Sequence, residues 1–296
     1  MFEIKKLNAI AEEQRRRLPL TNTFGINQLL SMPEYFGWVE CAPYSPNETF
    51  RMFLGGNDDG VALRFFWNGS YEQTTLKAWS WYSKQSDVIV DIGTHTGAFT
   101  LSALTANPNS TVVSFEPHFM NFARLNLNLR ANHLTTDNNF MLGVGEKNKM
   151  LPFSISTSLD YLSTGGSIGD RDEGLTRNIQ VVALDSFLRN PAKEQVKLIK
   201  IDTEGHEAHC LKGMTDVISS ARPIIFFECI NLIPGKEVQD ILSEFSYHFY
   251  FIDDSNGEIH PVERIEPALT AEGQPLMHLL NRIAMPSDKN IEKNYW

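Results

Sequence analysis

Four short apolar runs in this sequence end in an acidic side chain, and these acids are the first indication of chemistry. They are Asp91, Glu116, Asp202 and Glu228. If the runs are parallel strands, their carboxyl ends meet at one edge of a sheet, where open α/β folds bind their ligands. One acid at such an edge is common, whereas four in register indicate a binding or catalytic site.

The first of these acids opens a turn that contains two glycines. Residues 87–100 read DVIVDIGTHTGAFT, which is an apolar run, then Asp91-x-Gly93-x-x-x-Gly97, then an apolar helical segment. A strand, a glycine-containing turn and a helix in this order allow the backbone to approach a ligand closely. They also present the free N–H groups of the helix N-terminus to it. The pattern therefore predicts a nucleotide-like cofactor at the turn.

The turn differs from the common nucleotide loops. It lacks the G-x-G-x-x-G of dehydrogenases and the Lys-Ser/Thr of phosphate loops, and His95 stands where a glycine would admit a pyrophosphate. An acid just before the turn suits a cation such as the ammonium of an amino acid. Glu116 is placed to accept hydrogen bonds from ribose hydroxyls, although a helix N-terminal acid favoured by the dipole is the alternative. A ribose with a cation indicates S-adenosylmethionine rather than NAD.

The best catalytic candidate is the segment Lys200-Ile201-Asp202-Thr203-Glu204-Gly205-His206-Glu207. It joins a predicted central strand to a helix, at the sheet edge where the other acids are expected to gather. Asp202 or His206 could remove a proton from an acceptor hydroxyl, with Glu204 orienting or helping. Capping of the helix N-terminus is the alternative for Glu204, and both interpretations remain open.

The remaining pattern predicts an α/β fold with a mainly parallel sheet. The predicted strands are 61–67, 88–90, 111–115, 140–144, 151–156, 179–182, 196–201, 223–227, 247–252 and 277–284. The predicted helices are 1–18, 71–82, 98–104, 119–132, 206–219 and 238–245. No helix separates the last two strands, so we expect an antiparallel pair at one edge of the sheet.

The whole chain narrows the class of protein further. Its formal net charge of -10 argues against nucleic-acid partners and anionic membranes. Three widely spaced cysteines form no disulfide framework and indicate a reducing compartment. The N-terminus is too charged for a signal peptide, and no apolar run approaches the length of a membrane span. We therefore expect a cytoplasmic protein without a membrane span.

Two other motifs suggest different chemistry. Residues 165–169 match the G-x-S-x-G elbow of serine hydrolases, but that elbow requires a strand before it and a helix after it. A loop over the substrate site is the preferred interpretation. His206, His209 and Cys210 invite a metal, yet the spacing is one residue short of H-E-x-x-H, and one helical turn supplies too few ligands. We expect no metal.

Four stretches closely resemble the FkbM-type family of S-adenosylmethionine-dependent methyltransferases. They are DVIVDIGTHTGAFT, VVSFEPHFMNFARLNLNL, VKLIKIDTEGHEAHCLKGM and RPIIFFE, and the resemblance covers about residues 69–284. It implies a Rossmann-like class I methyltransferase fold. We accordingly predict an N-terminal extension over residues 1–68 and a methyltransferase domain over residues 69–296.

The resemblance also implies roles for individual residues. It assigns the methionine end of the cofactor to Asp91, Gly93, Thr94 and Gly97, and the ribose to Glu116. Tyr71 and Glu72 resemble a segment before the sheet that covers the cofactor. The expected cofactor site comprises Tyr71, Glu72, Asp91, Gly93, Thr94, His95, Gly97, Glu116 and Pro117. The sequence departs from the family at His95, often Asn, and at His206, often a small residue.

The resulting hypothesis is an S-adenosylmethionine-dependent O-methyltransferase that acts on a hydroxyl of a sugar, glycoconjugate or small natural product. The acceptor is thus a small molecule or carbohydrate, with no nucleic-acid partner. Two alternatives belong to other classes. One is an NAD-dependent oxidoreductase on a similar sheet, which the missing G-x-G-x-x-G disfavours. The other is a catalytically silent protein that binds the cofactor.

Overall fold

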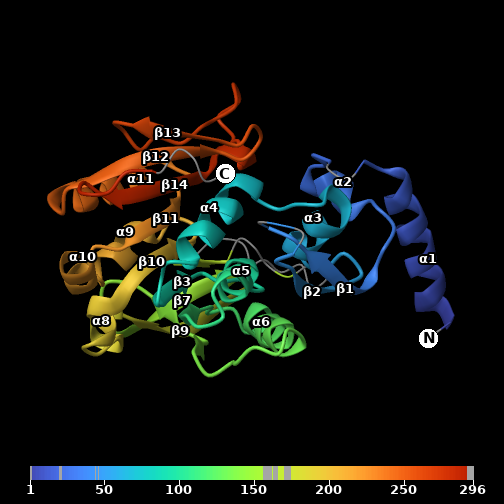
Figure 1. The fold of residues 1–296 in the computed structure, drawn as a ribbon, viewed down its shortest axis with the longest axis horizontal. Coiled ribbons are helices and arrows are strands. Elements are labelled where there is room, and N and C mark those ends of the chain that lie inside the picture. The colour runs from blue at the N-terminus through green and yellow to red at the C-terminus, as the bar shows by residue number, and fades with distance from the viewer. Residues whose placement is uncertain are drawn as a thin grey trace.

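An eight-stranded sheet forms the centre of the computed structural model, which describes residues 2–19, 22–43, 45, 47–155, 162, 166–169 and 175–291 (Figure 1). The strand order is β13-β12-β14-β11-β10-β3-β4-β5. Five neighbouring strands are parallel: β3 (Val88–Ile92), β4 (Thr111–Phe115), β5 (Asn139–Phe140), β10 (Val196–Ile201) and β11 (Ile224–Glu228). Three are antiparallel: β12 (Tyr247–Asp253), β13 (Glu258–Val262) and β14 (Asn281–Pro286). The predicted mainly parallel α/β sheet is confirmed.

The order of the strands creates a crevice at the centre of this sheet. From β3 the sheet grows to β4 and β5 on one side, whereas β10 and β11 lie on the other side. Asp91 on β3 is in register with Lys200 on β10, and Ile92 with Ile201. Because the connections from β3 and β10 leave in opposite directions, they open a crevice beyond the carboxyl ends of the strands, where such sheets bind ligands.

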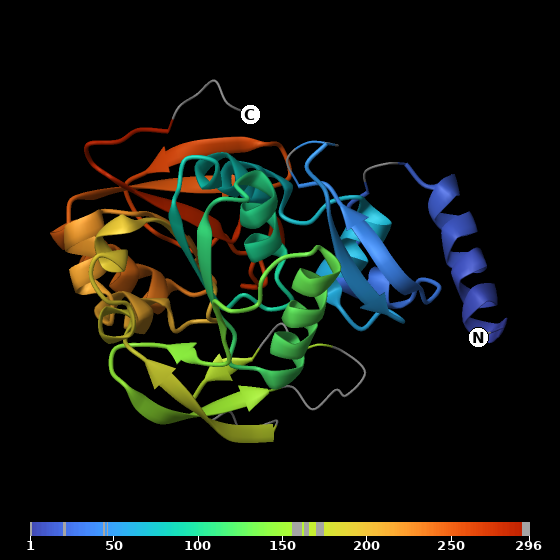
Figure 2. The same ribbon diagram turned by 60° about the horizontal axis from the view of Figure 1, so that its bottom comes forward.

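Helices cover both faces of the sheet (Figures 1 and 2). One face packs on α4 (Gln73–Ser83), α5 (Ala98–Ala106) and α6 (Phe119–Ala131), and the other on α9 (Glu207–Lys212), α10 (Thr215–Ala221) and α11 (Leu232–Glu244). Ile89 packs with Trp79 in the first core, whereas its neighbours Val88 and Val90 pack in the second. Both faces of β3 are therefore buried, which explains its uninterrupted apolar sequence.

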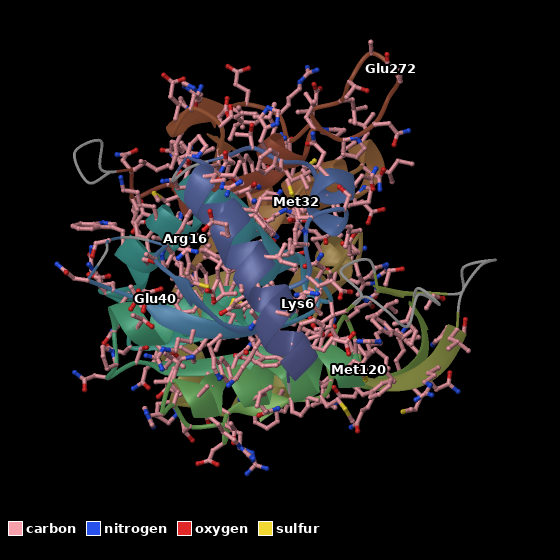
Figure 3. The ribbon with its side chains drawn as sticks, turned by 90° about the vertical axis from the view of Figure 1, so that its right-hand side faces the viewer. Lys6, Arg16, Met32, Glu40, Met120 and Glu272 are labelled. Carbon is pink, nitrogen blue, oxygen red and sulfur yellow. The ribbon has the colours of Figure 1, made fainter. Side chains whose placement is uncertain are left out.

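The N-terminal residues form α1 (Phe2–Arg17), α2 (Ile26–Leu30), the antiparallel pair β1 (Phe36–Cys41) and β2 (Phe50–Gly55), and α3 (Gly60–Asn68). Figure 3 shows α1 crossing the outer side, with Lys6 and Arg16 along it. The Asn8 amide joins α1 to β1 through the backbone N–H and C=O of Phe36, at 2.9 and 2.8 Å. Trp67 of α3 shares the core that contains Trp79. The domain boundary after residue 68 stays a prediction.

A smaller sheet lies beside the central one (Figure 2). Its order is β6-β9-β7-β8, with β6 (Gly143–Val144), β7 (Lys149–Ile155), β8 (Ser167–Ile168) and β9 (Leu175–Val182). Two short helices, α7 (Leu184–Phe187) and α8 (Ala192–Gln195), lead from it to β10. The predicted strands at 151–156 and 179–182 correspond to β7 and the end of β9, apart from residue 156, which is outside the described residues.

Two predicted strands are wrong in detail. Residues 61–67 form the helix α3, because the Asp59 carboxylate accepts the backbone N–H groups of Val61 and Ala62, and Gly69 ends the helix in a left-handed conformation. A short apolar run cannot by itself distinguish a strand from a buried helix. Residues 140–144 are also not one strand, since the chain leaves β5 after Phe140 and enters the smaller sheet at Gly143.

The predicted helix over 206–219 is two helices, α9 and α10. A Cβ on Gly213 would lie 2.0 Å from the Gly145 carbonyl oxygen, so the chain passes too close to Gly145 for a side chain there. Asp185 then accepts the N–H groups of Asp216 and Val217 at the start of α10.

At the sheet edge, β12 and β14 are antiparallel as predicted. However, β14 lies between β11 and β12, and β13 forms the edge. The second strand also begins later than predicted, because Met277–Leu279 forms the short 3-10 helix η1. No helix within the described ranges is long and apolar enough to cross a membrane.

Candidate active site

A cavity of about 640 Å³ opens at the carboxyl ends of β3, β4, β10 and β11. We call the lining residues at or just after the ends of these strands the strand-end floor; they are Gly93, His95, Glu116, Asp202 and Glu228. A second side of the cavity comes from residues 22–26, 61–73 and 275–280. We call the lining residues between 22 and 73 the N-terminal wall. They include Phe24, Gly25, Arg64, Tyr71 and Glu72. A cavity of this size is in the range of small-molecule and cofactor sites.

Gly93 forms the closest backbone contact of the floor. Its φ is +78°, and a Cβ at this position would lie 1.7 Å from the Asp202 carbonyl oxygen. The Asp202 N–H donates to the Ile92 carbonyl at 2.9 Å, so the loops after β3 and β10 are joined at this point. Only glycine satisfies both the left-handed conformation and the close approach. The glycine predicted from the sequence therefore fixes the centre of the crevice.

Glu116 lines the cavity although its side chain is only 5% exposed. One carboxylate oxygen accepts the N–H of His95 and the other accepts the N–H of His118, both at 2.8 Å. Burial raises the pKa of Glu116 to about 7. The Asn121 side chain also hydrogen-bonds to this carboxylate. A carboxylate has about four acceptor positions, so Glu116 is held rigidly and can still accept a hydrogen bond from a ligand. Pro117 lines the cavity beside it.

His95 contributes its backbone to the floor. Its φ is +53°, which directs the N–H to Glu116, and its ring Nδ1 lies 3.2 Å from the Thr96 hydroxyl. Burial lowers the pKa of His95, which favours a neutral ring. His95 lines the cavity, so it both shapes the loop and borders the space where a ligand would lie.

Asp202 lines the cavity beside a buried cation. Its carboxylate lies 3.1 Å from the Lys200 ammonium, which is 1% exposed and stands over the Phe99 ring. Glu228 lines the same region, and burial followed by the charge of Asp202 raises its pKa well above the usual range. Asp202, Glu228 and Glu72 in turn raise the pKa of Lys200 against the effect of its burial. The Lys200 ammonium and the Asp202 carboxylate thus form an ion pair at the border of the cavity.

Tyr71 and Glu72 lie together in the N-terminal wall and line the cavity. Glu72 precedes α4 with φ +38° and accepts a hydrogen bond from the Asn281 amide at 2.9 Å. Burial raises the pKa of Glu72 to about 7, with Lys200 opposing and Asp254 adding to the rise. Burial also raises the pKa of Tyr71 well above its ordinary value. The segment expected to cover a cofactor is therefore brought to the cavity.

Three of the expected cofactor residues support the floor from below instead of lining the cavity. Asp91 is 1% exposed and accepts the Thr100 hydroxyl at 2.7 Å, and burial raises its pKa to about 6. The Thr94 hydroxyl donates to the Asp91 carbonyl at 2.9 Å. At Gly97 a Cβ would meet the Leu125 side chain at 2.6 Å, so this glycine permits close packing of α5 on α6. These residues shape the turn from within.

The two remaining catalytic candidates, Glu204 and His206, differ in whether they border the cavity. Glu204 lines the cavity with φ +55°. His206 does not line it, since its ring stacks on His209 at 4.5 Å between centroids and faces Gly145. Burial lowers the pKa of His206 to about 4, so the ring is neutral. Glu207 holds the loop by accepting the N–H groups of Thr203 and Gly205.

Sequence reasoning missed most of the rest of the cavity. Arg64 and residues 22–26 reach it from the N-terminal part, and Asp254 and residues 275–280 reach it from the C-terminal part. No motif marks these positions, because their place depends on how distant segments pack. Asp254 is the exception, since it lies two residues after the predicted strand 247–252, directly after β12, and repeats the pattern of acids at strand ends.

The competing motifs gain no support. Gly165 lies outside the described residues, and Ser167 belongs to the two-residue strand β8, paired with Ser154 of β7. A nucleophile elbow needs a helix directly after the serine, and the described residues Ile168 and Gly169 are not helical. A search of the described residues finds no group of three or more His, Cys, Asp or Glu side chains that could hold a metal ion.

Comparison with known proteins gives the family. A model of the methyltransferase FkbM domain matches residues 91–262, more than half of the chain. Hexuronic acid methyltransferase AglP of Haloferax volcanii is 26% identical over 174 residues, 58% of this chain and 68% of that protein. Methyltransferase 1 of Beauveria bassiana is 26% identical over 146 residues, 43% of this chain and 58% of the relative.

Among solved structures, the FkbM methyltransferase of Methylobacillus flagellatus KT is 16% identical, with a TM-score of 0.41, over 76% of this chain and 53% of that chain. The matched residues 91–262 contain the acids of the strand-end floor, Glu116, Asp202 and Glu228, while the N-terminal wall precedes them. By this match, and by a sheet whose parallel strands bring those acids to one crevice, the chain belongs to the FkbM-type family of methyltransferases and has their Rossmann-like class I fold.

Proposed function

We propose that this protein is an S-adenosylmethionine-dependent O-methyltransferase whose acceptor is a hydroxyl of a sugar or a similar small molecule. The observation that carries the proposal is the strand-end floor, where Gly93, Glu116 and Asp202 border one cavity. Glu116 offers carboxylate oxygens for ribose hydroxyls, and Glu72 offers a carboxylate for the ammonium of the aminoacyl end. A chain that belongs to a methyltransferase family supplies the reaction type.

The cofactor, when bound, would supply a methyl group that its sulfonium makes electrophilic. The protein has to hold an acceptor oxygen in line with that methyl and exclude water, and such positioning contributes several kcal/mol. Asp202 is our choice of base. The Asp202 carboxylate would accept the proton of the acceptor hydroxyl and later pass it to water, while that oxygen would receive the methyl group that the cofactor supplies. The products would be a methyl ether and S-adenosylhomocysteine.

The acceptor class is inferred from a relative and from the lining of the cavity. The relative in Haloferax volcanii is named a hexuronic acid methyltransferase, which suggests a carbohydrate acceptor for this chain as well. The cavity is large and its acids can accept hydrogen bonds from several hydroxyls, as a sugar would offer. We therefore place sugars first in any search for the acceptor.

The cofactor is tested by calorimetric titration with S-adenosylhomocysteine and, separately, NADH. We expect a saturable signal with the first and none with the second, and the reverse would identify an oxidoreductase. Transfer of a radiolabelled methyl group to a panel of neutral and acidic glycosides then tests the acceptor. Tight cofactor binding with no transfer to any compound or to a lysate would instead indicate a catalytically silent protein.

The choice of base has its own test. Asp202→Asn keeps the shape of the side chain but removes the base, so we expect turnover to fall about 10²–10⁴-fold while cofactor affinity changes little. His206→Ala is the control, because His206 lies outside the cavity, and its turnover should stay within a few-fold of wild type. Full turnover by Asp202→Asn would show that the base is another residue, and Glu204 would be examined next.

A further inference from the structure

Arg64 gives the cavity one feature that the proposed reaction does not use. Six acidic side chains border the cavity, Glu72, Glu116, Asp202, Glu204, Glu228 and Asp254. Arg64 is the single lysine or arginine among the described residues of its lining. It comes from α3, outside the segment that the family model matches, and it is partly buried. The described lining therefore holds one cation among six acids, and the proposed reaction gives this cation no role.

Most N–H donors of Arg64 have no hydrogen-bond partner among the described residues. A guanidinium carries five N–H donors, and in Arg64 one nitrogen, Nη1, donates to the Gly60 carbonyl at 2.9 Å. Within the described parts of the chain no carboxylate lies within ion-pair distance of it. Arg124, which does not line the cavity, is by contrast paired with Asp58 through two hydrogen bonds. Arg64 is therefore not held as a structural ion pair.

Arg64 borders the cavity together with the Tyr71 ring. The guanidinium carbon stands 5.9 Å from the centre of the Tyr71 ring, and Tyr71 borders the cavity next to Glu72. An aromatic face on one side limits the motion of the planar group and leaves its N–H edge for a ligand. Arginine binds planar carboxylates through two parallel hydrogen bonds, which a lysine cannot form.

We propose that Arg64 binds a carboxylate in the cavity, beside Tyr71 and Glu72. This inference rests on the proposed function, because two participants in that reaction can carry the group. One is the aminoacyl end of S-adenosylmethionine, whose ammonium Glu72 would hold. The other is an acidic sugar as the methyl acceptor. Both present the same chemistry to Arg64, so the test has to separate them.

The experiment compares wild type with Arg64→Met by calorimetry and saturation-transfer NMR. S-adenosylhomocysteine carries the aminoacyl carboxylate, and 5′-methylthioadenosine lacks it. Glucuronate and glucose, each added with saturating S-adenosylhomocysteine, form the second matched pair. Arg222→Met is the control, because Arg222 also stands over a tyrosine, 5.7 Å from the Tyr247 ring centre, but far from the cavity lining. Should Arg64→Met fold poorly, Arg64→Lys keeps the charge and tests whether the two parallel hydrogen bonds of the guanidinium are needed.

A cofactor carboxylate predicts that Arg64→Met weakens S-adenosylhomocysteine about 10- to 100-fold while 5′-methylthioadenosine stays within twofold. An acceptor carboxylate predicts unchanged binding of both nucleosides and a selective loss of glucuronate. If no affinity changes, or if both nucleosides weaken equally, the inference is wrong. Wild-type protein that does not bind S-adenosylhomocysteine at all contradicts the proposed function itself, so the two failures are distinguishable.

Discussion

The strand-end floor and the N-terminal wall border the same cavity but are built differently. In the floor, the acids are fixed by the sheet: Glu116 accepts two backbone N–H groups, and Asp202 is paired with the buried Lys200. In the wall, Arg64 leaves most of its donors without a protein partner among the described residues, and Gly25 has open space around it. The floor is rigid and acidic, whereas the wall is looser and carries the cation.

This difference suggests a division of labour. A rigid floor that hydrogen-bonds its own acids is preorganised for a part of the ligand that does not vary. Tyr71 and Glu72 of the wall are expected to meet the cofactor. The rest of the wall has unfilled donors and space and can be altered with little effect on the sheet, which suits recognition of a variable acceptor. The family match contains all five residues of the floor and none of the wall, which agrees with this division.

The largest expected effect is a difference in stability between substitutions at two glycines that line the cavity. Gly93→Ala forces a Cβ into the Asp202 backbone at φ +78°, so we expect a loss of roughly 4 kcal/mol or more in the free energy of unfolding. Gly25→Ala meets nothing within 4 Å, and as a helix N-cap it should cost no more than about 1 kcal/mol. Chemical denaturation measures both. Equal losses would contradict the contrast between a rigid floor and a tolerant wall.

A smaller effect is expected for the ribose contact. Glu116→Gln removes the charge that would accept ribose hydroxyls but keeps the shape, so S-adenosylhomocysteine should bind about 10- to 100-fold more weakly. Asp185→Asn is the matched control, because Asp185 also accepts two backbone N–H groups, at 2.9 and 3.0 Å, but lies outside the cavity lining. It should lose stability without losing affinity. Unchanged binding by Glu116→Gln would remove the ribose assignment.

The smallest expected effect is a dependence of cofactor affinity on pH. Burial raises the pKa values of Glu116 and Glu72 to about 7, and only their ionised forms accept hydrogen bonds on every oxygen. Each of the two carboxylates should therefore raise the affinity for S-adenosylhomocysteine by up to about tenfold from pH 6 to pH 8, after which the affinity levels off, with protons released on binding. Titrations in two buffers of different ionisation enthalpy count those protons. A flat profile would place both carboxylates outside the binding site.

The same shifts affect stability in the opposite direction. A carboxyl whose pKa is higher in the folded state than in the unfolded chain binds more protons when folded. Its contribution to the free energy of unfolding is then lost as pH rises from the unfolded value toward the folded one. For Asp91 that interval runs from about 4 to about 6, and for Glu116 and Glu72 it extends to about 7. A ligand that stabilises the ionised forms restores this stability.

Much of the floor could be predicted from the sequence because it is encoded locally. Short apolar runs, the acids that follow them and the glycines at 93 and 97 are features of neighbouring residues, and parallel strands bring such ends to one edge. The same local reasoning failed for residues 61–67. Their apolar run fits a strand as well as a buried helix, and the Asp59 cap decides between them.

The sequence by itself therefore determined the family motifs, the parallel sheet and the edge at which its acids gather. Only the tertiary structure decided which residues border the cavity. It placed Glu116 and Asp202 there, put Asp91 beneath the turn and directed His206 toward His209. It also brought Arg64 from the N-terminal part to Tyr71. These placements depend on the order of the strands and on contacts between segments far apart in the chain, which spacing along the sequence does not encode.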